Sequence, residues 1–484
     1  MASVKLGLVA VLLLSSAVAR ADVEISNKPT QNMSCNAGVC TATAQKAVLN
    51  VGDLATMLAG GDATVKTGSV AKDIDVGQPL SWTSTARLTL DAQQSVQIEK
   101  QVTVTGQGAL TVTTNDSGAK AKNKTGEFVI VPEHGSVQFW DLASSLIIDG
   151  NSYMLVGDIK TLASDIAANP SGFYALAKPY DASADGIYTS SPTQVVFQGV
   201  FEGMGNGISK FSMNSDAASS TGLFAMVGDG GSVRDLAIVN ALLDSKGTQQ
   251  VGLLAELNYG QIVRCWVTGN IHFSRAAYDV GGLVAGNLGT ITNSHVDMRL
   301  SGSAGNFYTF ANVGGLVAAN GGTITSSYAL GSVAYRHTDR SDMGGLVGEN
   351  FGIIENTYSL NRVKSGRKTT DSNNFGGLLG VLDSAGSVSS SYAAGEIEVD
   401  QAASPGGLIG WYADGHIKNT YWNLDGGISD PAQGAGNEKN VGGITGLTTQ
   451  QLQSGLPDGF DPKTWGQAPN INNGYPYLLA NPPR

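Results

Sequence analysis

The chain is poor in charged residues. Only 14% of its 484 residues are Asp, Glu, Lys or Arg, against about a quarter in an ordinary globular protein. The 29 basic residues are outnumbered by 40 acidic ones, which gives a formal net charge of −11. Nucleic-acid binding depends on clustered Lys and Arg that neutralise phosphates. The composition therefore argues against a nucleic-acid partner.

The common catalytic motifs are also missing. The five histidines are His134, His272, His295, His337 and His416. None of them lies in a His-Glu-x-x-His zinc motif, and the chain has neither a Gly-x-Ser-x-Gly elbow nor a phosphate-binding loop. The densest charged loop contains Arg336, Asp339, Arg340 and Asp342, which we interpret as a solvated turn. The sequence thus predicts no catalytic residue, no metal site and no cofactor.

Long apolar runs are absent after the first 21 residues. Lys5 precedes an apolar stretch from Leu6 to Leu14, and Ala19-Arg20-Ala21 fits a small-x-small cleavage site. This pattern is typical of a secretory signal peptide, and the stretch is too short for an ordinary membrane span. We expect a signal peptide over residues 1–21, no membrane span after its removal, and a secreted or cell-surface protein. A periplasmic location fits as well.

Cysteine is scarce, with three in the whole chain. Cys35 and Cys40 lie in "CNAGVC" within the expected leader, residues 22–46, and in an oxidising compartment this spacing favours a small disulfide loop. A zinc site would need two more ligands nearby. Cys265 falls inside a repeat and is predicted to be a buried thiol.

Glycine, in contrast, is abundant, and it reveals a repeat. A Gly-Leu pair, or Gly-Ile in the last copy, recurs at Gly222, Gly252, Gly282, Gly315, Gly345, Gly377, Gly407 and Gly443. The spacings are 30, 30, 33, 30, 32, 30 and 36 residues. Such a constant period indicates a solenoid. The apolar runs in each copy are short, β-branched and bounded by Gly, Asn and Ser, which indicates strands.

These repeats predict an all-β fold, a right-handed parallel β-helix of roughly 30-residue turns. Stacked turns bury side chains that recur at equivalent positions. We expect inward columns of Leu after the Gly anchor and of Ile or Val in the second strand; these are Leu253, Leu283, Leu316, Leu346, Leu378 and Leu408, and Ile262, Ile291, Ile324, Ile354, Val388 and Ile417. A further inward column of small residues comprises Cys265, Ser294, Ser327, Thr357, Ser391 and Thr420. Asn287, Asn320 and Asn350 are predicted to form a corner ladder in left-handed conformation.

One column carries rings. The residues that follow the small column are Trp266, His295, Tyr328, Tyr358, Tyr392 and Tyr421. We expect them to point outward along one exposed edge of the solenoid. Exposed stacked rings suit binding of sugar or protein, whereas a purely structural ladder would stabilise neighbouring turns.

The rest of the chain divides around the repeats. Alternating patterns predict a second β-helical segment over residues 47–148, and residues 149–185 form a linker with one short helix. That helix would begin at Asp158, place Ile159, Leu162 and Ile166 on one face, and end at Asn169-Pro170. The repeat solenoid occupies residues 186–446. The tail, residues 447–484, has aromatics (Trp465, Tyr475 and Tyr477) that are expected to cover its open end.

The repeats resemble a known bacterial family. "GLVG" at Gly345, "GLLG" at Gly377 and "GLIG" at Gly407, with "GTITNS" and "GIIENTY", are similar to the GLUG repeats of exported proteins. Such repeats occur in filamentous-haemagglutinin-like exoproteins and beside the catalytic domain of IgA-cleaving metallopeptidases. The resemblance covers about residues 197–446, and implies a right-handed β-helix with an adhesive or surface-exposed role.

Three functions remain open from the sequence. The favoured one is a non-catalytic, surface-associated binding or adhesion module that recognises a polysaccharide or a surface protein. A second is a polysaccharide lyase or glycoside hydrolase on the same scaffold. That enzyme would need clustered acids, and Asp235, Asp279, Asp297, Glu349, Glu355 and Asp383 do not share one repeat position. A third is a purely structural surface or matrix protein.

Overall fold

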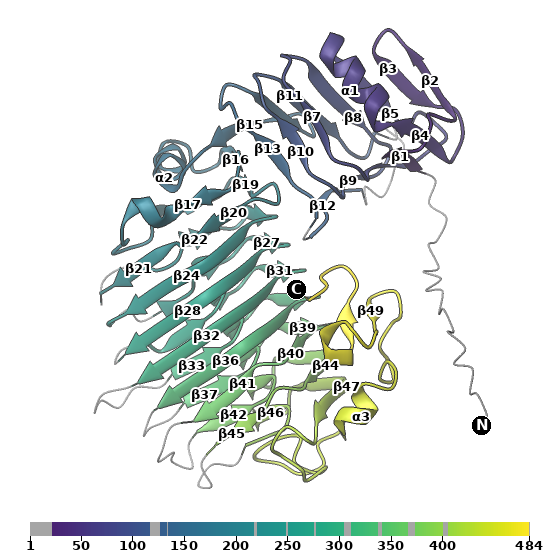
Figure 1. The fold of residues 1–484 in the computed structure, drawn as a ribbon. Helices are drawn as coiled ribbons and strands as arrows, with labels where there is room; N and C mark the ends of the chain where they lie inside the picture. Colours follow the sequence, from purple (N-terminus) through teal and green to yellow (C-terminus); the bar gives the residue numbers. More distant parts are fainter. Residues whose placement is uncertain are drawn as a thin grey trace, which may run out of the picture.

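In a computed structural model of the chain, two stacked β-coils follow one another, and a tail packs along the second (Figure 1). The structure describes residues 22–116, 126–132, 134–216, 220–247, 250–274, 277–303, 311–336, 341–365, 373–399 and 405–483. The predicted signal peptide, His337, Asp339 and Arg340 lie outside these residues, as does the side chain of Arg336.

The N-terminal coil, residues 22–148, has three parallel sheets. The first contains β1 (Asp22–Ser26), β4 (Ala47–Asn50), β6 (Asp73–Val76), β9 (Val96–Ile98) and β12 (Phe128–Ile130). The second contains β7 (Leu80–Trp82), β10 (Val102–Val104) and β13 (Val137–Phe139). The third contains β3 (Val39–Ala42), β5 (Ala63–Lys66), β8 (Arg87–Asp91), β11 (Ala109–Thr113) and β14 (Ser145–Ile148). Because β1 pairs with both β4 and β6, this coil begins at Asp22 rather than at residue 47.

Two features at the start of this coil need separate mention. β2 (Met33–Asn36) and β3 form an antiparallel hairpin in which Cys35 and Cys40 face each other and are joined by a disulfide. Helix α1 (Val51–Gly60) was not predicted. Asn50 caps it by accepting hydrogen bonds from the backbone N–H groups of Gly52 and Asp53, and Leu54 and Leu58, one turn apart, are buried.

The predicted linker is itself part of the stack. β15 (Asn151–Val156) turns back along β14, then pairs in parallel with β16 (Phe173–Leu176), which pairs with β19 (Val200–Glu202). Helix α2 (Ile159–Ala168) lies between them, as predicted. The Asp158 side chain accepts from the backbone N–H of Thr161, and Ile159, Leu162 and Ile166 are buried.

The C-terminal coil, residues 193–447, is the predicted parallel β-helix. One sheet has eight strands: β18 (Thr193–Phe197), β22 (Phe224–Val227), β26 (Ala255–Asn258), β30 (Val284–Asn287), β34 (Val317–Asn320), β38 (Val347–Asn350), β43 (Leu379–Leu382) and β46 (Ile409–Tyr412). A second has five: β25 (Gln250–Val251), β29 (Asp279–Gly281), β33 (Ala311–Gly314), β37 (Ser341–Gly344) and β42 (Asn374–Gly376).

The third face of this coil is made of two strands per turn. The first strands are β19, β23 (Ser232–Arg234), β27 (Gln261–Val263), β31 (Thr290–Thr292), β35 (Thr323–Thr325) and β39 (Ile353–Glu355); the second are β20 (Gly207–Ser209), β21 (Ser212–Ser215), β24 (Ala237–Ser245), β28 (Trp266–Ser274), β32 (His295–Ser303), β36 (Tyr328–Arg336), β40 (Tyr358–Ser359), β41 (Arg362–Ser365) and β45 (Ile397–Glu398). β44 (Ser387–Ala393) and β47 (His416–Asn423) span both parts, and β48 (Ile444–Leu447) adds to β47.

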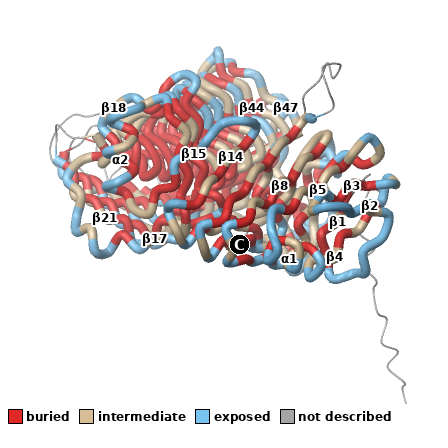
Figure 2. Tube along the Cα trace, turned by 90° about the horizontal axis from the view of Figure 1, so that it is seen from above, coloured by how far each residue is buried: buried red, intermediate tan, exposed pale blue. Residues whose placement is uncertain are grey.

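The inward columns are those predicted, except that Ile417 in the last turn is only half-buried. All six Leu side chains are fully buried, as are Ile262, Ile291, Ile324 and Ile354, and the small column from Cys265 to Thr420 is buried too. Figure 2 shows this buried interior along the coil, with exposed residues gathered at its rims. At Gly282 an added Cβ would lie 2.2 Å from the carbonyl oxygen of Gly315, so close contact between turns, not a positive φ, requires glycine there.

The asparagine ladder forms, with one correction to its conformation. The side-chain amides of Asn258, Asn287 and Asn320 each donate to the Oδ1 atom of the next Asn, ending at Asn350, over 2.7 Å. These asparagines are not left-handed. The positive φ values fall at the bend between the two strands of the third face: Asp235, Arg264, Asn293, Ser326, Asn356, Ser390 and Asn419 have φ between 46° and 53°.

Candidate functional site

The ring column is in register over successive turns. Trp266 pairs with His295, His295 with Tyr328, Tyr328 with Tyr358, and Tyr358 with Tyr392. The planes of each successive pair are within 8° of parallel, and the centroids are 4.4–5.9 Å apart. The sequence therefore placed these rings correctly relative to one another.

The expected exposure of the ring column is wrong. Tyr328, Tyr358 and Tyr392 are fully buried, and His295 and Tyr421 are nearly so. The tail, residues 448–483, covers them: Leu452, Phe460, Trp465 and Leu478 form one apolar cluster with the four tyrosines. The tail thus lies along the side of the coil (yellow in Figure 1). The prediction that it covers the open end of the solenoid is wrong. It contains α3 (Thr449–Leu452), β49 (Trp465–Gly466) and β50 (Tyr477–Leu478).

Hydrogen bonds fix the tail to the rings. The hydroxyl groups of Tyr421, Tyr392 and Tyr328 donate to the carbonyl oxygens of Asp458, Pro476 and Pro482, respectively, over 2.8, 2.6 and 3.1 Å. Later tail residues contact earlier turns, so the tail runs back towards the N-terminal coil. Most of the ring column is therefore part of the protein core and is not available to a ligand.

Trp266 is the exception. It is the first ring of the column and is half-buried. It lines a cavity of about 290 Å³ between the two coils, which we call the junction cavity. The N-terminal coil contributes Gln101 and residues 130–132 and 134–136. The C-terminal coil contributes Gly205, Asp235, Arg264, Trp266, Asn293 and His295, and the tail contributes Asn481.

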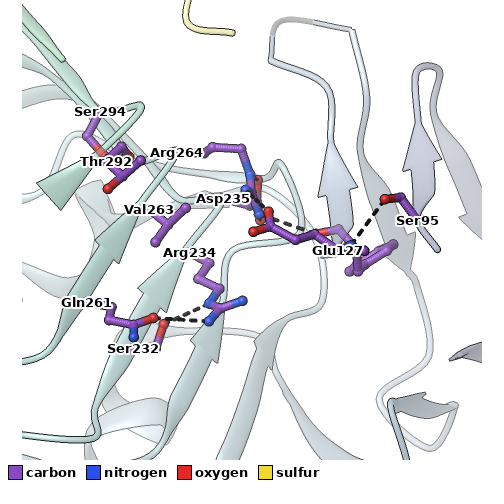
Figure 3. Close-up of polar contacts among 12 residues, drawn as sticks. Ser95, Glu127, Ser232, Arg234, Asp235, Gln261, Val263, Arg264, Thr292 and Ser294 are labelled. Carbon is purple, nitrogen blue, oxygen red and sulfur yellow. Dashed lines mark hydrogen bonds and ion pairs between the residues drawn. The ribbon is translucent and has the colours of Figure 1, made fainter. Parts of the chain in front are cut away.

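A buried ion pair borders the junction cavity. The Nε and Nη2 atoms of Arg264 donate to the two carboxylate oxygens of Asp235 over 2.7 and 2.9 Å. The same guanidinium reaches the N-terminal coil, where it contacts the Glu127 carboxylate over 3.4 Å and the Phe128 carbonyl oxygen over 3.3 Å (Figure 3). Arg264 thereby connects the two coils across the cavity.

Glu202 lies beside this pair and is fully buried. Burial and the nearby negative charge of Asp235 raise the pKa of Glu202 to about 8, so this carboxyl group holds a proton at neutral pH. A protonated and an ionised carboxyl group side by side are the groups that glycoside hydrolases use. Glu202, however, does not line the cavity and is closed off from a polymer.

A second hollow lies on the outer face of the C-terminal coil, across β24, β28, β32, β36 and β41, which run side by side in Figure 1. We call this the outer groove; its volume is about 680 Å³. Lys246, Arg299, Arg362 and Lys364 line it, together with His272, and among the described residues Asp244 is the one acidic lining residue. Ser301, Ser332 and Ala334 line it with small side chains. The whole chain has a net charge of −11, whereas the lining of the groove has more basic than acidic side chains.

Ion pairs within the protein neutralise part of the positive charge of the groove. His272 lies 3.0 Å from Asp244. Arg362 contacts Glu396 and Glu398 over 3.1 and 2.5 Å, and Lys364 contacts Glu398 over 3.0 Å. Lys246 and Arg299 are exposed and form no ion pair within the described residues. Sequence analysis missed this groove, because its lining positions recur from turn to turn but carry different residue types, such as Arg299, Ser332 and Arg362.

Two Asp and two Asn residues also form a ladder that was not predicted. Asp279, Asn312, Asp342 and Asn374 are in register, and the Asn312 amide donates to both Asp279 and Glu349 over 3.0 and 3.2 Å. The signal was present, since each of the four lies three residues before a Gly anchor. Its members are buried or paired with amides and form a structural corner.

Cys265 and possible metal ligands are the other chemical candidates. Burial raises the pKa of the Cys265 thiol to about 12, so it stays protonated and unreactive. Among the described residues, no three His, Cys, Asp or Glu side chains come together as metal ligands. Within the same residues, no helix has the length and apolar character needed to cross a membrane.

Comparisons with known proteins show distant structural likeness. No protein-family model and no curated protein sequence matches this chain. A solved chain described as IgA1 protease is 21% identical with a TM-score of 0.42, over 54% of this chain and 20% of that one. A chain from Bacteroides ovatus designated an immunoglobulin A1 protease is 16% identical with a TM-score of 0.40, over 68% of this chain and 92% of that one. The chain thus spans about a fifth of the first of these proteins.

Proposed function

We propose that the protein is an exported, surface-associated binding module that holds an acidic polysaccharide in the outer groove and does no catalysis of its own. The observation that carries this proposal is the groove itself. It is open, extends over five successive strands, and has four Lys or Arg side chains against one Asp in its lining. The signal-peptide pattern and the GLUG-like repeats support export and an adhesive role.

The spacing of the cations suits a polymer. Arg299 and Arg362 occupy the same register position two turns apart, with Ser332 between them, so their Cα atoms are about 10 Å apart. The small side chains between them leave room for a chain that runs along the coil axis. An anionic group on every second sugar could then meet successive arginines, while serine hydroxyls bind the sugar in between.

Retention on immobilised polysaccharides tests this proposal. We expect polygalacturonate and hyaluronan to retain the purified protein, dextran not to, and added salt to weaken retention because it screens exposed charges. Arg299→Ala with Lys364→Ala should reduce retention at least tenfold. Lys418→Ala is the matched control, since Lys418 is an exposed cation on β47 outside the groove.

Three outcomes would overturn the proposal. Equal retention of the double variant and the wild type would remove the groove from the binding site. New reducing or unsaturated ends in the same incubations would show that the protein is a carbohydrate-active enzyme. Failure of every acidic polymer to retain the protein would instead favour a protein partner or a structural role.

A further inference from the structure

The junction cavity is distinct from the outer groove and has features of a binding site. Its walls include three parts of the chain that are far apart in sequence: residues 130–132 and 134–136, the bend at Arg264 and Trp266, and Asn481 in the tail. Its volume, about 290 Å³, is just below the roughly 300–1,000 Å³ range of small-molecule sites. It therefore suits a single small ring system and not a polymer strand.

One part of the cavity is apolar. Ile130, Val131 and Pro132 contribute aliphatic surface, and Trp266 contributes an indole. The orientation of this indole is fixed, since it stacks on His295 at an interplanar angle of 8°. A rigid aromatic wall of this kind packs well against the C–H face of a pyranose ring.

The polar lining includes two side-chain amides, Gln101 and Asn293, that have no partner among the described residues. The side chains of Gln101 and Asn293 line the cavity and form no hydrogen bond within the described part of the chain. Each amide offers two donors and one acceptor oxygen, the complement that sugar hydroxyl groups need. Gln101 comes from the N-terminal coil and Asn293 from the C-terminal coil, so one ligand could contact both.

Three of the other polar lining residues, Asp235, Arg264 and Asn481, are held in place; His134 and Ser136 also line the cavity. Arg264 and Asp235 neutralise each other in a two-point contact, and both are buried. Asn481 is fixed as well, because its amide nitrogen donates to the carbonyl oxygens of Ser294 and Ser326. A neutral ligand avoids the cost of burying an uncompensated charge in such a site.

From these contacts we infer that the junction cavity binds a neutral monosaccharide, or the terminal unit of an oligosaccharide, with its ring against Trp266 and its hydroxyl groups on Gln101 and Asn293. The inference does not depend on the outer groove, which recognises charge along a polymer. The two sites would let one protein bind a chain end and a polyanion separately.

Titration of the full protein with soluble sugars tests the inference. The probes are the methyl glycosides of glucose, galactose, mannose and N-acetylglucosamine and their disaccharides, followed by calorimetry or ligand-observed NMR. We expect at least one probe to bind saturably and its uronic acid counterpart to bind at least fivefold more weakly. Trp266→Ala should weaken binding at least tenfold, and Gln101→Ala, at an exposed position that should not affect folding, at least threefold.

Trp140→Ala is the matched control, because Trp140 is 56% exposed and lies outside the cavity. Absence of binding by every probe would overturn the inference. So would binding that Trp266→Ala and Gln101→Ala leave unchanged. The groove variant Arg299→Ala with Lys364→Ala should bind the sugar normally; loss of sugar binding in that variant would assign the sugar to the groove. Sugar binding without polymer retention would refute the proposed function and leave this inference standing.

Discussion

His295 Nδ1 lies 2.9 Å from Oδ1 of Asn481, 186 residues further along the chain. The amide nitrogen of Asn481 donates to two backbone carbonyl oxygens, which leaves its oxygen facing the imidazole. The Nδ1 atom of His295 must therefore carry the hydrogen of this bond. The contact attaches the end of the tail to the second ring of the column, beside the junction cavity.

This contact predicts the effect of a single substitution in the tail. Asn481→Ala removes three hydrogen bonds and leaves the buried His295 N–H unsatisfied, so the free energy of unfolding should fall by about 1–3 kcal/mol. Urea unfolding followed by tryptophan fluorescence would measure the change. Asn470→Ala, at an exposed tail position, should have no effect. An equal response of the two variants would mean that the tail end is not anchored at His295.

Two buried tyrosines of the ring column should respond differently to loss of the hydroxyl group. The Tyr392 hydroxyl donates to Pro476 and accepts from Asn472 over 2.6 and 3.0 Å, whereas the Tyr358 hydroxyl has no hydrogen-bond partner within the described residues. Tyr392→Phe should therefore destabilise the protein by about 1–2 kcal/mol. Tyr358→Phe should be neutral or slightly stabilising. Thermal unfolding of both variants provides the comparison, and the reverse order would contradict the docked position of the tail.

Loss of the whole ring is a stronger test of the tail contact. Tyr358→Ala should destabilise the protein by about 3–5 kcal/mol, since the ring is fully buried between the coil and Trp465. An exposed ring column would instead tolerate this change. Limited proteolysis should cut the tail of this variant faster than that of the wild type, with Leu346→Asp as a reference that disrupts the coil core itself.

Glu202 should make stability depend on pH. Its pKa is about 8 in the folded protein and about 4.3 when unfolded, so the unfolded chain binds fewer protons between these values. The free energy of unfolding should therefore fall as pH rises from about 4.3 to 8, by up to roughly 1.4 kcal/mol per pH unit from this group. Glu202→Gln removes the titration.

Urea unfolding at pH 5 and pH 9 would test this dependence. The advantage of Glu202→Gln over the wild type should grow by a few kcal/mol between the two pH values. Glu99→Gln, at an exposed position, serves as the control. Parallel pH profiles for the wild type and Glu202→Gln would show that Glu202 is not held in its protonated form.

The asparagine ladder should be sensitive to a single gap. Asn320 accepts from Asn287 and donates to Asn350, both over 2.7 Å, and it is fully buried. Asn320→Ala removes both of these buried hydrogen bonds, so we expect a loss of about 2–4 kcal/mol in the free energy of unfolding. Thr323→Ala, three residues away and half-buried, should lose much less. A small effect of both would mean that water replaces the missing amide.

The regular repeat made the buried columns of the coil predictable from the amino-acid sequence. Each turn contacts its neighbours in the same way, so a column such as Leu253 to Leu408 or Asn287 to Asn350 shows its burial through its period. Helix α2 was equally local, with a cap at Asp158 and an apolar face. Helix α1 carries the same kind of local signal at Asn50, Leu54 and Leu58, and the β-rich pattern around it hid that signal.

The burial of the ring column, in contrast, could not be predicted from the repeat. Local periodicity correctly showed that Tyr328, Tyr358 and Tyr392 share one edge, but it carries no information on what covers that edge. The cover is a non-repeating tail that returns over 186 residues to His295, and such long-range docking depends on complementary shape and hydrogen bonds between distant segments. The junction cavity has the same origin, because Gln101, Trp266 and Asn481 become neighbours only when both coils and the tail are folded together.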